Sequence, residues 1–163
     1  MSALEIKSIN DADWIAEFLV EHWGADYLVT RGRRIESGHL TGAQALAGGK
    51  PVGLITWQIK GEGTEKEMEI VTLDSYERQS GVGSFLLEHA VAIARVSGVR
   101  RVWLVTTNDN LDALRFYQRR GMRLCAIHKD AVTEARKQKP EIPEIGNFGI
   151  PLWDEVELER VLK

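Results

Sequence analysis

A short glycine-containing turn at residues 76–84 constrains the fold of this chain more than any other feature. It follows a β-rich run at 68–73 and leads into an apolar-periodic segment at 82–96, which predicts a helix. Backbone N–H groups at the start of a helix have no partner within the helix, and the helix dipole favours an anion there. Gly81 and Gly83 have no Cβ, so a ligand can approach the backbone closely. The turn is therefore interpreted as a phosphate-binding site.

Two common nucleotide-binding motifs are absent from this turn. A P-loop needs a lysine directly after its last glycine, whereas Ser84 follows Gly83. A dinucleotide fingerprint needs a third glycine, where Leu86 stands, and an acidic residue about twenty positions further on, where residues 99–102 read Val-Arg-Arg-Val. What remains is Arg-x-x-Gly-x-Gly over residues 78–83, a pattern that a simple tight turn could also produce.

A second motif, further along the chain, indicates which kind of phosphate ligand the turn could bind. Residues 78–84 resemble the acetyl-CoA pyrophosphate loop, Q/R-x-x-G-x-G/A, of the GNAT N-acetyltransferase superfamily. Residues 110–122, NLDALRFYQRRGM, resemble that family's second signature, N-x-x-A-x-x-F-Y followed by a glycine. The two signatures occur in the family's order, and the clear resemblance covers about residues 67–124. It implies a single α/β domain over residues 1–163, with a mixed, mostly antiparallel sheet of about seven strands flanked by helices.

The chain before the turn is compatible with that fold, because it predicts an antiparallel meander rather than the β-α-β start of a dinucleotide-binding domain. Gly48-Gly49-Lys50-Pro51 is a hairpin signal between two of the expected strands. Asn10 or Asp11 can cap the first helix. The elements expected here are a strand at 4–9, a helix at 12–22, and strands at 44–47, 52–60 and 67–73.

After the turn, strand and helix signals alternate. The strand at 101–106 should lie parallel to the strand before the turn, because a helix connects them. The other expected elements are a helix from Asn110 to 120, a strand at 122–128, a helix at 130–138 and a last strand at 156–162. A minimal GNAT domain joins its last two strands by a shorter turn, so residues 129–152 are an insertion. It could cover the acceptor site, form a dimer contact or only add packing.

Composition narrows the class of protein. A length of 163 residues suits one domain, and the net charge of −3 gives no support for a generally basic nucleic-acid binder. The single cysteine, Cys125, excludes an internal disulfide and suits a reducing compartment; we expect it to be a packed, inert thiol. The sequence has neither an apolar run of membrane-spanning length nor a signal-peptide pattern, so a soluble, cytoplasmic protein is expected.

The resemblance implies an acetyl-CoA-dependent N-acetyltransferase that moves the acetyl group directly to an amine in a ternary complex. The acceptor could be a small molecule or a protein amine, and a homodimer is possible; neither nucleic acid, a membrane nor a metal is implied. The expected cofactor-binding residues are Leu73, Arg78, Gln79, Ser80, Gly81, Val82, Gly83, Ser84, Asn110, Ala113 and Phe116. The alternative is a non-catalytic acyl-CoA-binding domain with a regulatory or interaction role.

Direct transfer needs a base and a group that stabilises the leaving thiolate. Glu69 stands where many GNAT enzymes carry their base, and Glu67, on the same side of the strand, is the second choice. Tyr117 matches the family tyrosine that donates a hydrogen bond to the thiolate. A backbone N–H near Leu73 is expected to polarise the acetyl carbonyl group. Asn110 could hold the pantetheine arm or serve only as a helix cap.

Residues near the N-terminal helix are candidates for contact with the acceptor. In the family, the first helices and the following loop often form one wall of the acceptor site, which makes Trp23, Tyr27 and His39 candidates; packing in the core or at its rim is the alternative. The basic cluster at 31–34, Arg-Gly-Arg-Arg, is expected to be solvated surface, with attraction of an anionic group as the other possibility.

Overall fold

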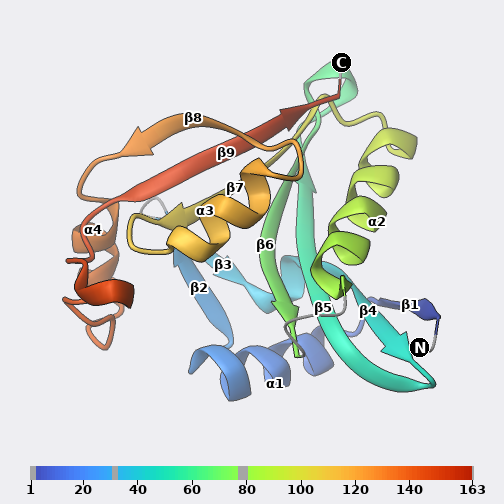
Figure 1. The fold of residues 1–163 in the computed structure, drawn as a ribbon, viewed down its shortest axis with the longest axis horizontal. Helices are drawn as coiled ribbons and strands as arrows, with labels where there is room; N and C mark the ends of the chain where they lie inside the picture. The colour runs from blue at the N-terminus through green and yellow to red at the C-terminus, as the bar shows by residue number, and fades with distance from the viewer. Residues whose placement is uncertain (1–2, 31–32, 77–80, 163) are drawn as a thin grey trace.

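Seven strands form one sheet in the order β1-β4-β5-β6-β7-β9-β8 (Figure 1). The computed structural model describes residues 3–30, 33–76 and 81–162. β6 and β7 are parallel, and the other neighbouring pairs are antiparallel, so the predicted mixed sheet is confirmed. The strands of this sheet are β1 (Leu4–Ile9), β4 (Thr41–Ala47), β5 (Lys50–Lys60), β6 (Glu67–Ser75), β7 (Arg101–Thr107), β8 (Arg123–His128) and β9 (Glu155–Val161).

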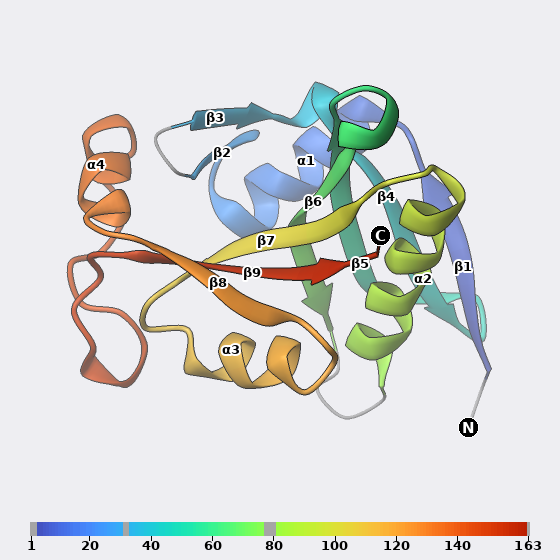
Figure 2. The ribbon, with the colours of Figure 1, turned by 90° about the horizontal axis from the view of Figure 1, so that it is seen from above.

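Helices lie on both faces of the sheet (Figure 2). One face carries α1 (Ala12–Trp23) and a separate hairpin of β2 (Tyr27–Thr30) and β3 (Arg33–Glu36); the other carries α2 (Val82–Val96) and α3 (Leu111–Gln118). The β2–β3 hairpin was not predicted, because its strands have only four residues each and show no clear alternation. Within the described residues, none of the helices is both long enough and apolar enough to span a bilayer.

Alternation along β5 builds two hydrophobic cores. Leu54 is fully buried on the α1 side, where it belongs to a cluster with Ile15 and Leu19. Ile55, its neighbour, is fully buried on the α2 side, in a cluster that includes Leu86. Since successive residues of a strand face opposite sides, a central strand covered on both faces is apolar at consecutive positions, as β5 is from Val52 to Ile55.

The parallel pair β6–β7 is short. Within these strands the register runs from Glu67 opposite Arg101 to Glu69 opposite Trp103 and then stops. β6 continues to Ser75 and β7 to Thr107, but the two strands diverge (Figure 1). The sheet therefore has an opening between β6 and β7, and α2 and α3 both begin near its wide end.

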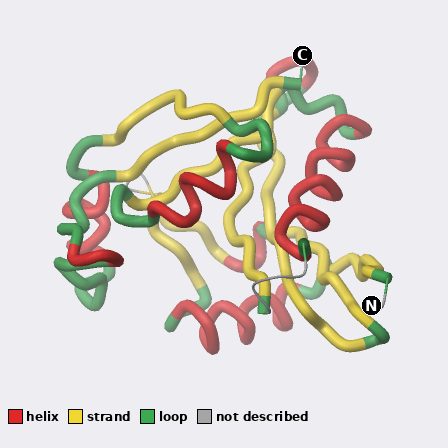
Figure 3. The backbone as a smooth tube through the Cα atoms, viewed as in Figure 1, coloured by secondary structure: helices red, strands yellow, loops and turns green. Residues whose placement is uncertain are grey.

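The segment between β8 and β9 contains α4 (Ala131–Gln138) and a long loop (Figure 3). The Arg136 guanidinium on α4 donates hydrogen bonds to the carbonyl oxygens of Ile142, Pro143 and Leu152, at 3.1, 2.9 and 3.0 Å. Asp109, buried just after β7, accepts a hydrogen bond from the Asn147 N–H at 2.7 Å. These contacts hold the loop against α4 and against the end of β7.

Candidate active site

Two cavities border the opening between β6 and β7. The cavity on the α2–α3 side, which we call the donor cavity, has a volume of about 460 Å³. The cavity on the β2–β3 side, the acceptor cavity, has a volume of about 300 Å³. Predicted site residues that line the donor cavity are Leu73, Gly83, Ala113, Phe116 and Tyr117. Predicted site residues that line the acceptor cavity are Glu69 and Asn110.

The start of α2 forms one side of the donor cavity. Gly81 precedes the helix with φ +72°, a left-handed conformation that favours glycine, and a Cβ there would meet nothing within 4 Å. Gly83 has a different role, because a Cβ at this position would lie 3.0 Å from two carbons of the Phe116 ring. The Val82 side chain is buried in the core. The N–H groups of this first turn have no partner within the helix, so they can bind an anion.

Three of the predicted cofactor-binding residues, Arg78, Gln79 and Ser80, lie outside the described residues. Their assignment to the phosphate loop stays a prediction.

Arginines give the donor cavity a positive wall that the sequence analysis did not assign. Arg115, Arg119 and Arg120 line it, with Asp112 as an acidic lining residue. The Arg120 Nε donates a hydrogen bond to Ser84 Oγ at 2.6 Å, and its guanidinium lies 3.8 Å from the centre of the Phe116 ring. The spacing of four residues between Phe116 and Arg120 is a local signal that could have indicated this contact.

Tyr117 is buried at the inner end of the donor cavity. Its ring meets that of Phe116 edge-on, with 5.0 Å between the ring centres. Burial and, to a lesser extent, the negative charge of Asp74 raise the pKa of Tyr117 well above its usual value. The phenol therefore stays protonated, and its hydroxyl group can donate a hydrogen bond.

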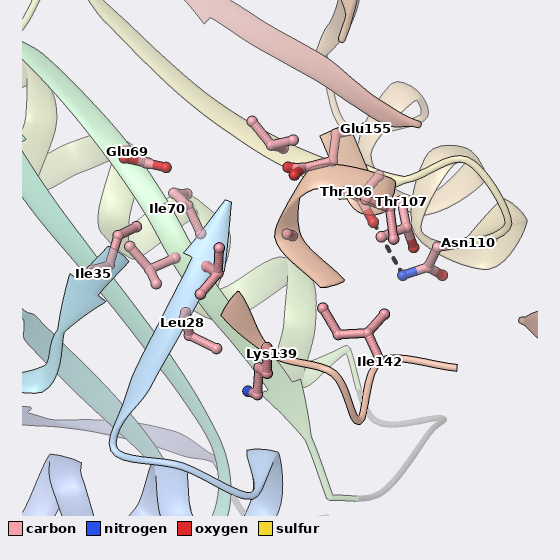
Figure 4. A pocket seen from close by; sticks show the side chains of 15 residues that line it. Leu28, Ile35, Glu69, Ile70, Thr106, Thr107, Asn110, Lys139, Ile142 and Glu155 are labelled. Carbon is pink, nitrogen blue, oxygen red and sulfur yellow. Dashed lines mark hydrogen bonds between the residues drawn. The ribbon is translucent and has the colours of Figure 1, made fainter. Parts of the chain in front are cut away.

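Asn110 acts as the cap of α3. Its Oδ1 accepts a hydrogen bond from the Ala113 N–H at 3.2 Å, and its Nδ2 donates to Thr106 Oγ1 at 3.2 Å (Figure 4). The capping role is thus confirmed. Because Asn110 also lines the acceptor cavity and Ala113 the donor cavity, the first turn of α3 lies between the two.

Glu69 is buried in the acceptor cavity and surrounded by donors. Arg33 Nη2 donates to both carboxylate oxygens, at 3.2 and 3.0 Å, and Gln58 Nε2 donates to Oε1 at 3.0 Å. A second glutamate in this cavity, Glu155, is equally buried, with 5% of its surface exposed in each case. Sequence reasoning missed Arg33, Gln58 and Glu155. Gln58 lies directly opposite Glu69 in the antiparallel pairing of β5 and β6, so an alignment of these two strands could have indicated the contact.

Glu67, the second choice for the base, has a different environment. It pairs with Arg100 and with Arg101 Nε, the latter at 3.1 Å. It does not line the acceptor cavity, although it borders a neighbouring cavity that also includes Glu69. The two glutamates share one side of the strand and this neighbouring cavity, but only Glu69 also lines the acceptor cavity.

Of the other acceptor candidates, Tyr27 and His39 do not line the acceptor cavity. Tyr27 lies beside it, with the Arg34 guanidinium 3.7 Å from its ring centre. His39 is exposed and borders a smaller cavity near Arg34. The side chain of Trp23 lies outside the described part of the chain.

Two expectations from sequence need correction. In the basic cluster, Arg31 and Gly32 lie outside the described residues, and Arg34 is solvated surface paired with the exposed Glu36. Arg33 departs from the expectation, because it binds the buried Glu69. Cys125 is not packed in the core but exposed on β8, which is an edge strand. Its Sγ lies 3.5 Å from a carboxylate oxygen of Glu157, and burial of the thiol together with that charge raises the pKa of Cys125 to about 11, so an unreactive thiol is still expected.

In the described part of the chain, His, Cys, Asp and Glu side chains do not gather in groups of three or more that could hold a metal ion.

Comparisons with solved structures show that other proteins have the same fold. The structure of IAA acetyltransferase from Bacillus cereus ATCC 14579 superposes with a TM-score of 0.74, at 24% identity, covering 98% of this chain and 100% of that one. A GNAT family acetyltransferase from Elizabethkingia anophelis, with acetyl-CoA bound, superposes with a TM-score of 0.69, at 19% identity, covering 98% of each chain.

Sequence comparison establishes the relationship directly. The uncharacterized protein YdhI of Bacillus subtilis (strain 168) is 36% identical over 149 residues, which are 91% of each chain. The model of the acetyltransferase (GNAT) family matches residues 5–122, a range that includes both signatures and every candidate site residue named above up to Arg120. This chain therefore belongs to the GNAT family of acetyltransferases.

Proposed function

We propose that this protein is an N-acetyltransferase, formed by one domain over residues 1–163, that moves an acetyl group from acetyl-CoA directly to an amine in a ternary complex. The observation that carries the proposal is that both cavities border the same opening in the sheet. β6 contributes Glu69 to the acceptor cavity and Leu73 to the donor cavity, and the start of α3 contributes Asn110 and Ala113 in the same way. Two substrates bound there would face each other across β6 and α3.

The donor cavity suits acetyl-CoA because it is positively charged where phosphates would lie. The first turn of α2 offers N–H groups, and Arg115, Arg119 and Arg120 add cationic side chains. The acetyl-CoA found in the Elizabethkingia anophelis relative supports the same donor here. The acetyl carbonyl oxygen would accept a hydrogen bond from a β6 backbone N–H near Leu73, which stabilises the oxyanion.

The acceptor must lose a proton to become a nucleophile. An alkylammonium with a pKa near 10 costs about 4–5 kcal/mol to deprotonate at pH 7. We assign Glu69 as the base, acting directly or through water. Arg33 and Gln58 supply three hydrogen bonds to a carboxylate that has about four acceptor positions, so about one remains for the acceptor or its water.

Tyr117 is assigned to the leaving group. As the amine nitrogen bonds to the acetyl carbon, the C–S bond breaks and the electron pair stays on sulfur. Because the pKa of Tyr117 is raised, complete proton transfer to the thiolate is unfavourable, and the hydroxyl acts mainly by donating a hydrogen bond to the developing negative charge. The ammonium loses two protons in becoming an amide: the first goes to Glu69 before attack, and the second passes from the nitrogen, through water, to the thiolate, which leaves as the thiol of coenzyme A. The charges therefore balance without a covalent enzyme intermediate.

Calorimetric titration with acetyl-CoA, coenzyme A, ATP and NAD tests the donor assignment. We expect micromolar binding of acetyl-CoA and coenzyme A only. A screen of amines by thiol release, followed by initial-rate kinetics, then tests direct transfer, which gives intersecting rather than parallel double-reciprocal lines. Binding of acetyl-CoA without turnover of any amine would favour the alternative, an acyl-CoA-binding regulatory domain.

A homodimer and a cytoplasmic location stay predictions. Sedimentation equilibrium tests the first, and cell fractionation tests the second.

A further inference from the structure

The acceptor cavity separates acidic from aliphatic groups, and this separation indicates a substrate class. We propose that the acceptor is a small primary monoamine with an uncharged aliphatic body, whose ammonium group lies beside Glu69 and Glu155. The inference rests on the proposed function, because it assumes that the amine enters this cavity.

The walls of the cavity are mainly aliphatic. Of its fifteen lining residues, nine are Leu, Ile, Val or Ala, contributed by β2, β3, β6, β7, α4 and the loop after α4. None of the fifteen is aromatic. Each methylene group that such walls bury strengthens binding by about fourfold. A branched alkyl chain therefore gains more from this cavity than a polar chain of the same length.

The two acids lie at one border of the cavity. Figure 4 shows Glu69 and Glu155 at the upper border and Leu28, Lys139 and Ile142 at the lower border. Both glutamates are 5% exposed, so they attract a cation more strongly than acids in water would. The Lys139 ammonium lies 5.6 Å from the centre of the Tyr27 ring, outside the acidic border. The charges thus orient the amine with its head at Glu69 and its body toward Leu28 and Ile142.

The same walls exclude amines with several charges. A second ammonium at the far end of the acceptor would have to leave water and lie against aliphatic side chains near Lys139, which is strongly unfavourable. A carboxylate next to the amine would lie beside Glu69 and Glu155, which repel it. The volume of about 300 Å³ is at the lower end of the range for small-molecule sites. Polyamines, amino acids and peptide N-termini should therefore be poor acceptors.

A matched panel of amines tests the substrate class by thiol release. The probes are 3-methylbutylamine, 1,4-diaminobutane, leucine and a tetrapeptide with a free N-terminus. We expect kcat/KM for 3-methylbutylamine to exceed that of each other probe by at least about tenfold, the equivalent of two or more buried methylenes. A preference for the diamine, leucine or the peptide would overturn the substrate class and leave the acetyltransferase function standing. Acetyl-CoA binding without turnover of any probe would also overturn the substrate class, whereas the function itself would fall only if the wider amine screen gave no turnover.

A pair of variants on one loop tests the location. Ile142 lines the cavity, whereas Ile145 is 57% exposed and does not. Ile142→Trp should fill part of the cavity and lower kcat/KM for 3-methylbutylamine by about tenfold or more, with acetyl-CoA affinity unchanged. Ile145→Trp should change neither. Ile142→Ala enlarges the cavity and should shift the preference toward longer alkylamines. Unchanged selectivity in both Ile142 variants would show that the amine binds elsewhere.

Discussion

The hydrogen bond from Arg120 Nε to Ser84 Oγ, at 2.6 Å, joins the residues just after α3 to the first turn of α2. It fixes the width of the donor cavity, because these two helices form opposite sides of it. The guanidinium carbon also lies 3.8 Å from the centre of the Phe116 ring, so the side chain is held by two contacts of different kinds.

Replacement of Arg120 should therefore weaken the binding of acetyl-CoA. We expect Arg120→Ala to raise the calorimetric Kd by about 10–100-fold, the range for loss of a charge-assisted contact. Arg120→Lys should recover only part of the affinity, because an ammonium cannot stack on Phe116 as a planar guanidinium does. Arg123→Ala, an exposed arginine on β8, is the control and should bind normally. Wild-type affinity in Arg120→Ala would remove this residue from the donor site.

Gly81 and Gly49 form a second matched pair. Both have positive φ, +72° and +79°, and a Cβ at either would meet nothing within 4 Å. Alanine at either position should lower the free energy of unfolding by about 1–2 kcal/mol, the cost of a left-handed conformation. We expect only Gly81→Ala, and more strongly Gly81→Val, to lower acetyl-CoA affinity, since Gly49 lies in the β4–β5 turn. Equal affinities for the two alanine variants, by calorimetry, would contradict the phosphate-loop assignment.

Removal of the Tyr117 hydroxyl should affect turnover and not binding. Tyr117→Phe is expected to lower kcat by up to about 10²–10⁴-fold, with an unchanged Kd for acetyl-CoA. Tyr76→Phe is the control. The pKa of Tyr76 is also raised, to about 12, by burial first and then by the charges of Asp74 and Glu21. Tyr76 does not line the donor cavity, so loss of its hydroxyl should leave kcat unchanged. A kcat for Tyr117→Phe equal to that of the wild type would exclude the hydroxyl from the mechanism.

The choice between Glu69 and Glu67 is decided by pH profiles. Glu69→Gln should lower kcat/KM at pH 7 by about 10²–10⁴-fold, and the remaining rate should rise with pH as the free amine becomes available. Loss of the charge that Arg33 binds should also cost about 1–3 kcal/mol of stability. Glu67→Gln should keep the wild-type profile. If Glu67→Gln shows the loss instead, the assignment of the base is reversed.

The Cys125 thiol should be exposed but slow to react. With a pKa of about 11, raised by burial and by Glu157, the thiolate fraction at pH 8 is on the order of 10⁻³. Alkylation by iodoacetamide should therefore be slow at pH 8 and become faster up to about pH 11. Glu157→Gln should increase the rate at pH 8, because it removes the negative charge. A fast reaction of the wild-type protein at pH 8 would mean that the thiol lies in a different environment.

Local sequence patterns predicted most of the strands, the parallel β6–β7 pair and the cap at Asn110, because each depends on periodicity or on residues close together in the chain. The sheet as a whole was implied by the resemblance to the GNAT family. Contacts between distant elements could not be predicted in this way. Arg33 and Glu69 are 36 residues apart, and their pairing depends on where the β2–β3 hairpin packs. Cys125 was expected to be packed, but β9 inserts between β7 and β8, which leaves β8 at the edge.

The early end of β6–β7 pairing, after Glu69 and Trp103, has a consequence for exchange with solvent. β6 lies in the middle of the sheet, yet its N–H groups that face β7 beyond this point have no strand beside them. These amides should exchange their hydrogens for deuterium quickly, whereas those that face β5 exchange slowly. A ligand that accepts their hydrogen bonds would act as an added strand, and it would slow exchange at alternate residues of β6 between Ile70 and Ser75.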